Sequence, residues 1–290
     1  MTIMDAIKKG MIELKNSNIE SPKLKSRLLM QYVLKQTRQY IIVNDLNQIS
    51  KEDEERYFVG ISKLRAGVPL EHITHQREFM KLNFYINENV LIPRQDTEIL
   101  VEEVMKLTNS ESRVLDMCTG SGCIIISLAA SGHTSENGAV AIDISDDALK
   151  VADYNKKYNN ADYIKLIKSD MFSSSECEQY KNEDNRFDVI VSNPPYIPTK
   201  DIDELSEEVR LHDPVLALDG DTDGLKFYKA ITKQSVNYLK ENGYLCYEIG
   251  YNQAEDVRNI MEQCGYSGIK VIKDLAGLDR VVIGRLNNIN

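Results

Sequence analysis

The sequence lacks any apolar run approaching the roughly 20 residues that a membrane-spanning helix needs, and its first residues lack the apolar core of a signal peptide. A cytoplasmic protein is therefore expected. Basic residues are the minority charge, because 35 Lys and Arg stand against 45 Asp and Glu, a formal net charge of −10. Non-specific binding to nucleic acid depends on basic groups that displace counterions, so this balance argues against a phosphate backbone as partner, although a local basic patch would survive it.

Cysteine and histidine are scarce. The five cysteines are odd in number and include no Cys-x-x-Cys pair, which argues against a disulfide framework and against a zinc clip. Cys246 and Cys264 lie in apolar patterns and are expected to be core residues. Of the four histidines, His72 and His75 lie close together, but no nearby thiol or suitably spaced acidic residue completes a metal site. No metal is expected.

Hydrophobic residues make up 42% of the chain and charged residues 28%, as in ordinary globular proteins. Over residues 1–75 the apolar residues recur at helical spacing, for example at Met4, Ile7, Met11 and Leu14 and then at Leu24, Leu28, Leu29 and Tyr32. Ser21-Pro22 resembles a helix start, and Ser50 with Asp53 resembles a capping box that opens a helix ending near Gly67. The pattern predicts a small domain of four or five short helices.

Residues 76–96 form the predicted connection between this domain and the rest of the chain. Residues 78–92 alternate in part between apolar and polar side chains and contain Asn87-Glu88-Asn89, which favours a β-hairpin.

From residue 97 to 290, short apolar strands alternate with helices. Strands are expected at 114–116, 139–143, 164–167, 189–191, 244–249, 268–274 and 279–286, with helices at 124–130, from Ser145, at 224–241 and up to Cys264. Such alternation is typical of a mostly parallel sheet with helices on both faces. The short link 276–278 requires the last two strands to be antiparallel neighbours, since a parallel crossover needs a dozen residues. Seven strands with a final hairpin differ from the simple dinucleotide-binding order.

A glycine-rich loop follows the first of these strands. Asp116-Met117-Cys118-Thr119-Gly120-Ser121-Gly122 opens a helix, where free N–H groups and a close backbone approach favour a ligand. The next strand ends at Asp143, the position at which an acidic residue binds ribose hydroxyls in doubly wound sheets. The alternative is an ordinary turn with incidental glycines.

The loop departs from two well-known nucleotide motifs. Ile125 occupies the position where the dinucleotide fingerprint needs a third small residue, and the loop has no lysine for a triphosphate. A nucleoside without phosphates remains, and S-adenosylmethionine fits.

A second motif follows the fourth strand, at Asn193-Pro194-Pro195-Tyr196. The prolines stiffen the loop and remove two N–H donors. The side-chain oxygen of Asn193 and the carbonyl of Pro194 are then two acceptors that can hold an NH₂ group, and Tyr196 offers a ring face to a flat substrate. Holding both hydrogens favours the pyramidal nitrogen approached in the transition state of methyl transfer. The alternative is a rigid turn that ends a strand.

Taken together, these motifs make the chain resemble the HemK/PrmC family, the N5-glutamine methyltransferases of peptide chain release factors. The resemblance covers about residues 70 to 285. It rests, in order, on Arg77-Glu78-Phe79, 91–98 with Pro93-Arg94 and Thr97-Glu98, 115–122, Asp143-Ile144-Ser145, 169–172, Asn193 to Tyr196, Asp213-Pro214 with 217–220, Glu248-Ile249-Gly250 and 279–282.

The resemblance implies a seven-stranded class I S-adenosylmethionine methyltransferase sheet, Rossmann-like with an antiparallel last strand, which releases S-adenosylhomocysteine as product. It places the cofactor site on Cys118, Thr119, Gly120, Ser121, Gly122, Asp143, Met171 and Asn193. It places the glutamine site on Asn193, Pro194, Pro195 and Tyr196, with Asn193, Pro194 and Tyr196 as the catalytic residues. Cys118 replaces a glycine or another small residue of the family, and Met171 often an aromatic one, so cofactor packing is expected to differ at these two positions.

The expected reaction is methylation of the glutamine in the Gly-Gly-Gln motif of a release factor, with residues 1–75 docking that protein and the enzyme acting as a monomer. A DNA or RNA adenine or cytosine amino-methyltransferase would use the same four residues on a flipped base. However, residues 200–223 carry nine acidic residues against Lys200 and Arg210, which suits a basic protein better. Methylation of a glutamine in a ribosomal protein is a nearer alternative. A non-catalytic partner of the ribosome or release factor is a third class, but the intact Asn193-Pro194-Pro195-Tyr196 and Asp143 argue against lost activity.

Overall fold

The computed structural model describes residues 1–287, which divide into two compact units. The first unit contains Met1–Gln76 and Ser206–His212, and the second contains Arg77–Leu205 and the rest of the chain from Asp213. Within the described residues, no helix is long and apolar enough to cross a membrane.

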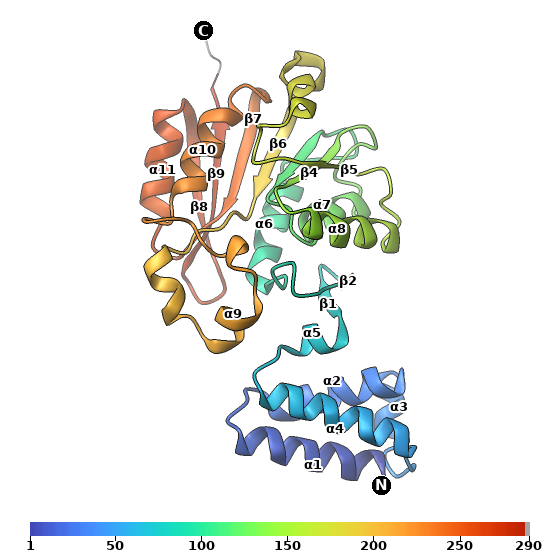
Figure 1. Ribbon diagram of the computed structural model, residues 1–290. Coiled ribbons are helices and arrows are strands. Elements are labelled where there is room, and N and C mark those ends of the chain that lie inside the picture. The colour runs from blue at the N-terminus through green and yellow to red at the C-terminus, as the bar shows by residue number, and fades with distance from the viewer. Residues whose placement is uncertain (288–290) are drawn as a thin grey trace. The chain divides into compact units, whose positions relative to one another are not determined.

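Helices make up most of the first unit (Figure 1). Its helices are α1 (Ile3–Asn16), α2 (Pro22–Leu34), α3 (Arg38–Val43), α4 (Lys51–Arg65), α5 (Leu70–Thr74) and α9 (Glu207–His212). The predicted capping box is confirmed, since the Ser50 hydroxyl accepts a hydrogen bond from the Asp53 N–H at 3.0 Å. Helix α2 begins at Pro22 as predicted, but Ser21 adopts a left-handed φ of 50° and its side chain makes no capping bond.

The buried faces of α1 and α2 differ from the predicted stripes. Helix α1 buries Ile3, Ala6, Gly10 and Leu14, so the prediction was wrong by one position along most of the stripe. The reason is close packing on α4, because a Cβ at Gly10 would lie 2.4 Å from the Tyr57 hydroxyl oxygen. Helix α2 buries Ser26, Leu29, Met30 and Val33 and leaves Leu24 and Leu28 exposed. The Ser26 hydroxyl bonds to the buried Tyr57 hydroxyl at 2.6 Å, so a polar pair takes the place of a predicted leucine contact.

The predicted hairpin exists, but its turn lies elsewhere. Strands β1 (Gln76–Phe79) and β2 (Leu82–Tyr85) are joined at Met80 and Lys81, whose φ angles of 49° and 63° match a two-residue hairpin turn. The Met80 N–H donates to the Glu98 carboxylate at 2.7 Å. This long-range bond and the buried rings of Phe79 and Phe84 stabilise a turn whose two residues carry no local turn signal, whereas the Asn-Glu-Asn segment forms a separate bend.

The second unit contains a seven-stranded sheet in the order β5-β4-β3-β6-β7-β9-β8, in which β9 runs antiparallel to the other six strands. The strands are β3 (Val114–Met117), β4 (Ala139–Asp143), β5 (Lys165–Lys168), β6 (Phe187–Ser192), β7 (Leu239–Glu248), β8 (Tyr266–Lys273) and β9 (Asp279–Leu286). The predicted fold is confirmed, including the antiparallel last strand. The chain runs outward from β3 to β5 and then returns to β6, so a topological switch lies between β3 and β6.

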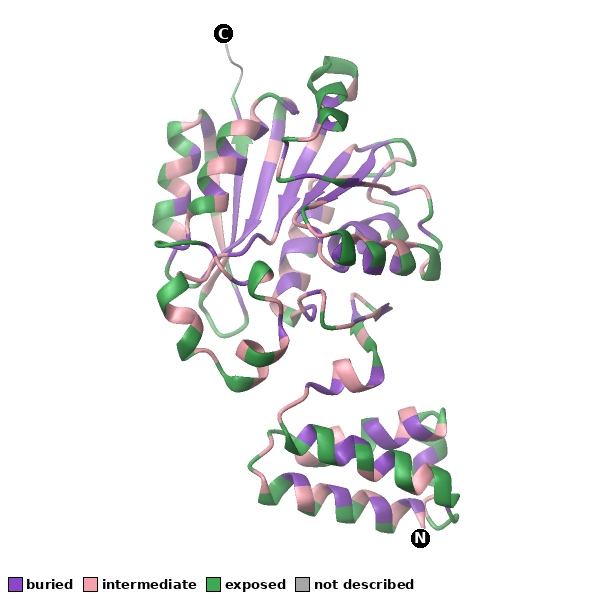
Figure 2. Ribbon diagram, viewed as in Figure 1, coloured by how far each residue is buried: buried purple, intermediate pink, exposed green. Residues whose placement is uncertain are grey.

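Helices cover both faces of this sheet, and its central strands are almost completely buried (Figure 2). Val114 of β3 belongs to the core formed with α6, α7 and α8, whereas the next residue, Leu115, belongs to the core formed with α10 and α11. The helices are α6 (Gln95–Met105), α7 (Cys123–Ala130), α8 (Asp146–Tyr158), α10 (Lys226–Ser235) and α11 (Ala254–Gln263), with short 3-10 helices η1 (Ser175–Lys181), η2 (Glu183–Asn185), η3 (Thr199–Glu204) and η4 (Val215–Ala217).

Helix α10 is shorter than the predicted helix at 224–241. It ends at Ser235, because Leu239 pairs with Phe187 as the first residue of β7 and the Phe187 N–H donates to the Tyr238 carbonyl at 2.8 Å. Asn242, with φ of 63°, lies at an irregularity of this strand and not at a helix end. Pairing with β6 therefore overrides the local helical pattern.

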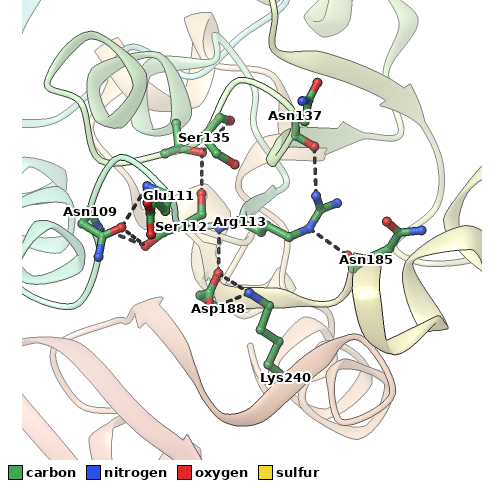
Figure 3. A network of polar contacts seen from close by, with 10 residues as sticks. Asn109, Glu111, Ser112, Arg113, Ser135, Asn137, Asn185, Asp188 and Lys240 are labelled. Carbon is green, nitrogen blue, oxygen red and sulfur yellow. Dashed lines mark hydrogen bonds and ion pairs between the residues drawn. The ribbon is translucent and has the colours of Figure 1, made fainter.

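A polar network fastens the amino ends of the strands (Figure 3). The Arg113 guanidinium donates to the carbonyls of Asn137 and Asn185, each at 3.1 Å, and the Arg113 N–H donates to Asp188 at 2.8 Å. Lys240 also binds Asp188, at 2.8 Å. These residues come from the starts of β3, β4, β6 and β7 or from the loops that precede them. Because this network lies at the amino ends of the strands, their carboxyl ends remain available for a binding site.

Candidate functional site

A cavity of about 370 Å³ opens at the carboxyl ends of β3, β4, β5 and β6. This volume falls within the usual range for small-molecule sites. Most of the residues predicted to bind cofactor or glutamine line the cavity, namely Cys118, Thr119, Gly120, Ser121, Asp143, Met171, Asn193 and Pro195. Gly122, Pro194 and Tyr196 are not lining residues of the cavity.

The loop after β3 is built from left-handed backbone. Cys118, Gly120 and Gly122 have φ of 62°, 54° and 81°. Gly122 has a steric reason as well, because a Cβ there would lie 2.8 Å from the Ile126 side chain. Cys118 therefore holds a conformation that costs a non-glycine residue on the order of 1 kcal/mol. Burial raises the pKa of its thiol, so the sulfur is protonated near neutral pH and is a poor nucleophile.

Asp143 fastens this loop to the end of β4. Its carboxylate accepts hydrogen bonds from the Gly120 N–H at 2.8 Å and from the Ser145 N–H at 2.9 Å. Burial raises the pKa of Asp143 above its ordinary value, although these backbone bonds act in the opposite direction. Two N–H bonds leave acceptor capacity on this carboxylate, which lines the cavity.

Asp116 supports the loop from beneath, a role that the sequence did not reveal. It is fully buried, and its carboxylate accepts from the Thr119 hydroxyl at 2.6 Å and from the Ile125 N–H at 3.4 Å. Because Ile125 lies in the first turn of α7, Asp116 satisfies one of the free donors of that helix. Burial raises the pKa of Asp116 to about 7.

The Asn193 loop leaves β6 at the other side of the switch point. The Ser192 hydroxyl donates to the Met117 carbonyl at 2.6 Å, which joins the ends of β6 and β3. Asn193 is half-buried, and its amide nitrogen donates to the Thr97 hydroxyl at 3.4 Å. Farther along, the Tyr196 carbonyl accepts from the Gln253 side chain at 2.9 Å. Tyr196 packs on the buried core, and its face toward a substrate stays a prediction.

Residues 91–98 and residues 213–220 carried part of the resemblance but had no assigned role. In the structure they meet at the cavity. Arg94, before α6, donates to Asp213 at 2.5 Å, and the Ile92 N–H approaches the same carboxylate at 3.5 Å. The contact places Pro93, Arg94 and Thr97 on one wall and Pro214, Leu216 and Ala217 on another. The spacing of these residues in the sequence gave no signal that they approach one another.

Met171 also lines the cavity, in a left-handed conformation with φ of 51°. Ile144, which is 46% exposed, lines it from the end of β4. Met171 and Ile144 thus line the same cavity as Asp143 with apolar side chains, and we expect the aromatic base of the ligand to contact them.

Comparison with known proteins agrees with this geometry. A family model described as PrmC N-terminal domain matches residues 5–74, and one described as methyltransferase domain matches residues 108–279. A release factor glutamine methyltransferase of Clostridium acetobutylicum is 39% identical over 286 residues, which cover 98% of each chain. The protein of the same description from Clostridium botulinum is 39% identical over 98% of this chain and 99% of its own.

Solved structures show the same fold. A methyltransferase from Pyrococcus furiosus aligns with a TM-score of 0.51 over 82% of this chain and 100% of that chain, at 14% identity. The near full-length identity to the curated relatives is the stronger finding, because it includes both the helical region and the catalytic domain. The chain belongs to the release factor glutamine methyltransferase family.

Proposed function

We propose that this protein transfers the methyl group of S-adenosylmethionine to the side-chain amide nitrogen of the glutamine in the Gly-Gly-Gln motif of a peptide chain release factor. The observation that carries the proposal is the convergence of two sites at one cavity. The glycine-rich loop with Asp143 forms one side, and Asn193 with Pro195 contributes to the other. Relatives that share nearly the whole chain are described by this activity.

The cavity residues fit the cofactor. Gly120 leaves the loop backbone open, since even a Cβ there would meet no atom within 4 Å, and Asp143 offers acceptor capacity for ribose hydroxyls. Ile144 and Met171 offer apolar contact for an adenine. When bound, S-adenosylmethionine supplies an electrophilic methyl group on a sulfonium.

Asn193 supplies the amide chemistry. Its side-chain nitrogen is engaged with Thr97, which leaves its oxygen to accept an N–H of the substrate glutamine. The Pro194 carbonyl is proposed to accept the other hydrogen. An amide nitrogen is a weak nucleophile because its lone pair is delocalised, and acceptors on both hydrogens favour the pyramidal state in which the lone pair is localised.

The acidic segment favours a protein substrate over a nucleic acid. In the second unit Asp203, Glu204, Asp221 and Asp223 are exposed. Lys226 and Lys229 pair with the last two, so this segment carries no excess of basic groups for a phosphate chain. The nucleic-acid amino-methyltransferase therefore remains the weaker candidate. The glutamine of a ribosomal protein is a nearer alternative, because Asn193 would hold its amide in the same way.

Mass spectrometry can identify the substrate. The enzyme is incubated with isotopically labelled cofactor and, separately, with a release factor, a release factor whose Gly-Gly-Gln glutamine is replaced by Glu or Ala, a ribosomal protein, and DNA or RNA. We expect the label on the glutamine of the intact factor and none at that position in the replaced factors. Undiminished total methylation of the replaced factors, or comparable methylation of adenine in nucleic acid, would contradict the glutamine assignment.

Asp143→Ala is expected to weaken cofactor binding by about 1 to 3 kcal/mol, the magnitude of a lost charge-assisted hydrogen bond. The change also releases the Gly120 N–H, which loosens the loop. Calorimetry measures the effect, with Asp147→Ala as a matched control, because Asp147 lies on the helix that follows Asp143 but is exposed and paired with Lys150. An unchanged dissociation constant for Asp143→Ala would show that Asp143 does not hold the ribose.

A further inference from the structure

The proposed function requires that the side-chain amide of Asn193 keep one orientation, and the Asn193 loop alone does not fix that orientation. An asparagine amide has an acceptor end and a donor end of nearly the same shape, and only the acceptor end can bind the N–H of a substrate glutamine. A rotation of this amide by half a turn would present donors to donors. Residues next to Asn193 must therefore favour one orientation of its amide over the other.

The sheet places Glu248 next to Asn193. Strands β6 and β7 are parallel, with Ser192 opposite Tyr247, so the residues that follow these two lie side by side at the carboxyl ends. Thr97, in the first turn of α6, lies against the same point, where its hydroxyl accepts from the Asn193 amide nitrogen at 3.4 Å. Thr97 and Glu248 are each 2% exposed.

Burial of the Glu248 carboxylate at this point costs free energy. One of its oxygens, Oε2, is buried and has no hydrogen-bond partner among the described residues. Burial raises the pKa of Glu248 to about 7, whereas hydrogen bonding from Thr97, the charge of Arg280 and hydrogen bonding from Asn193 act to lower it. The guanidinium of Arg280 is itself engaged with Asp274 at 3.0 Å and with Asp96 at 3.5 Å. A buried acid with so little compensation destabilises the fold, which is common at functional sites.

The titratable groups around Glu248 come from several elements. They are Arg280 of β9, Asp96 of α6, Tyr196 of the Asn193 loop, Tyr228 of α10 and Cys123 of α7. Burial raises the pKa values of both tyrosines and of the cysteine, so these three stay neutral near pH 7. Among the groups of this cluster whose pKa burial raises, Glu248 is the one raised to about neutral pH.

We propose that Glu248 and Thr97 are positioning residues that fix the amide of Asn193 with its oxygen toward the substrate. An ionised carboxylate only accepts hydrogen bonds, so in the proposed arrangement the single hydrogen of the Thr97 hydroxyl points to Glu248. The lone pairs of Thr97 then remain to accept from the Asn193 amide nitrogen. The reversed amide would place its oxygen against two acceptors and lose these bonds in a buried site.

The test compares Glu248→Gln, Thr97→Val and Thr97→Ser in the full-length enzyme with a release factor as substrate. Glu262→Gln, an exposed position on α11, is the matched control. A glutamine at 248 offers both a donor and an acceptor and so no longer dictates the amide orientation. We expect kcat to fall about 10- to 100-fold in Glu248→Gln and Thr97→Val, as for the loss of a preorganised transition-state contact. KM and the cofactor dissociation constant should stay within about 3-fold, and Thr97→Ser should recover most of the kcat lost in Thr97→Val.

Two further readouts separate positioning from a purely structural role. Glu248→Gln removes a buried charge, so its unfolding midpoint at pH 8 should equal or exceed that of the unchanged protein although it reacts more slowly. At saturating cofactor, the kcat of the unchanged enzyme should rise with pH between about 6 and 8, as Glu248 loses its proton, and this rise should be smaller in Glu248→Gln, in which Asp116 of the cofactor loop still titrates in this range.

An unchanged kcat and pH profile in Glu248→Gln would overturn the proposal, as would a loss of kcat that merely parallels lost stability and cofactor binding. If the unchanged enzyme does not methylate the release factor glutamine, the proposed function fails instead. The two failures are therefore distinguishable.

Discussion

Asn193→Ala is expected to lower kcat by a factor on the order of 10² or more, as happens when one preorganised transition-state hydrogen bond is removed. The side-chain oxygen of Asn193 is the acceptor that matters more as the substrate nitrogen becomes pyramidal. Because Asn193 also belongs to the predicted cofactor site, kcat is measured at saturating S-adenosylmethionine. Docking of the protein substrate, and with it KM, should be largely preserved.

Steady-state kinetics with a release factor measure this effect, and Asn237→Ala, an exposed position after α10, is the matched control. A loss confined to KM would contradict the mechanism, because it would mean that Asn193 binds substrate and transition state equally. No strong general base is needed, since methyl transfer leaves an N-protonated amide of very low pKa, whose proton can pass to the Pro194 carbonyl or to water. No histidine or glutamate is therefore assigned as a proton acceptor.

The parts of the site that follow strand ends could be predicted from the sequence. The loop at Cys118 to Gly122, Asp143 and Asn193 each come directly after a short apolar strand, and carboxyl ends of parallel strands meet at one edge of a sheet. The antiparallel last strand could also be predicted, because a three-residue link permits only a hairpin.

Contacts between distant segments could not be predicted in this way. The turn at Met80 depends on Glu98, the end of α10 depends on pairing with Phe187, and the amide of Asn193 meets Thr97, which lies 96 residues earlier. None of these partners leaves a periodic or local signal. The segments that carry the resemblance include Thr97 and Glu248, but only the folded sheet shows that these two residues lie beside Asn193.

The helical region is expected to dock the protein substrate and to contribute no catalytic group. Every residue that lines the cavity belongs to the second unit, whereas residues 5–74 match a family model of their own. The first unit has its own buried core, which includes Leu14, Leu29, Tyr57 and Leu64. A separate folded unit that contributes no residue to the cavity is suited to recognition of the protein substrate. The binding energy of such contacts, which lie far from the glutamine, can then accelerate the reaction there.

Removal of residues 1–76 should therefore abolish methylation of the intact release factor, with kcat/KM falling by at least about 10²-fold, while cofactor binding remains within about 3-fold. Cofactor affinity measured by calorimetry serves as the control that the remaining chain is folded, which matters because residues 206–212 pack with the removed unit. A short peptide that contains Gly-Gly-Gln is the second substrate. Its slow methylation should be unaffected by the truncation, since a peptide presents the glutamine without the surface that docks. Methylation of the intact factor at full efficiency by the truncated enzyme would show that docking depends on the catalytic unit alone.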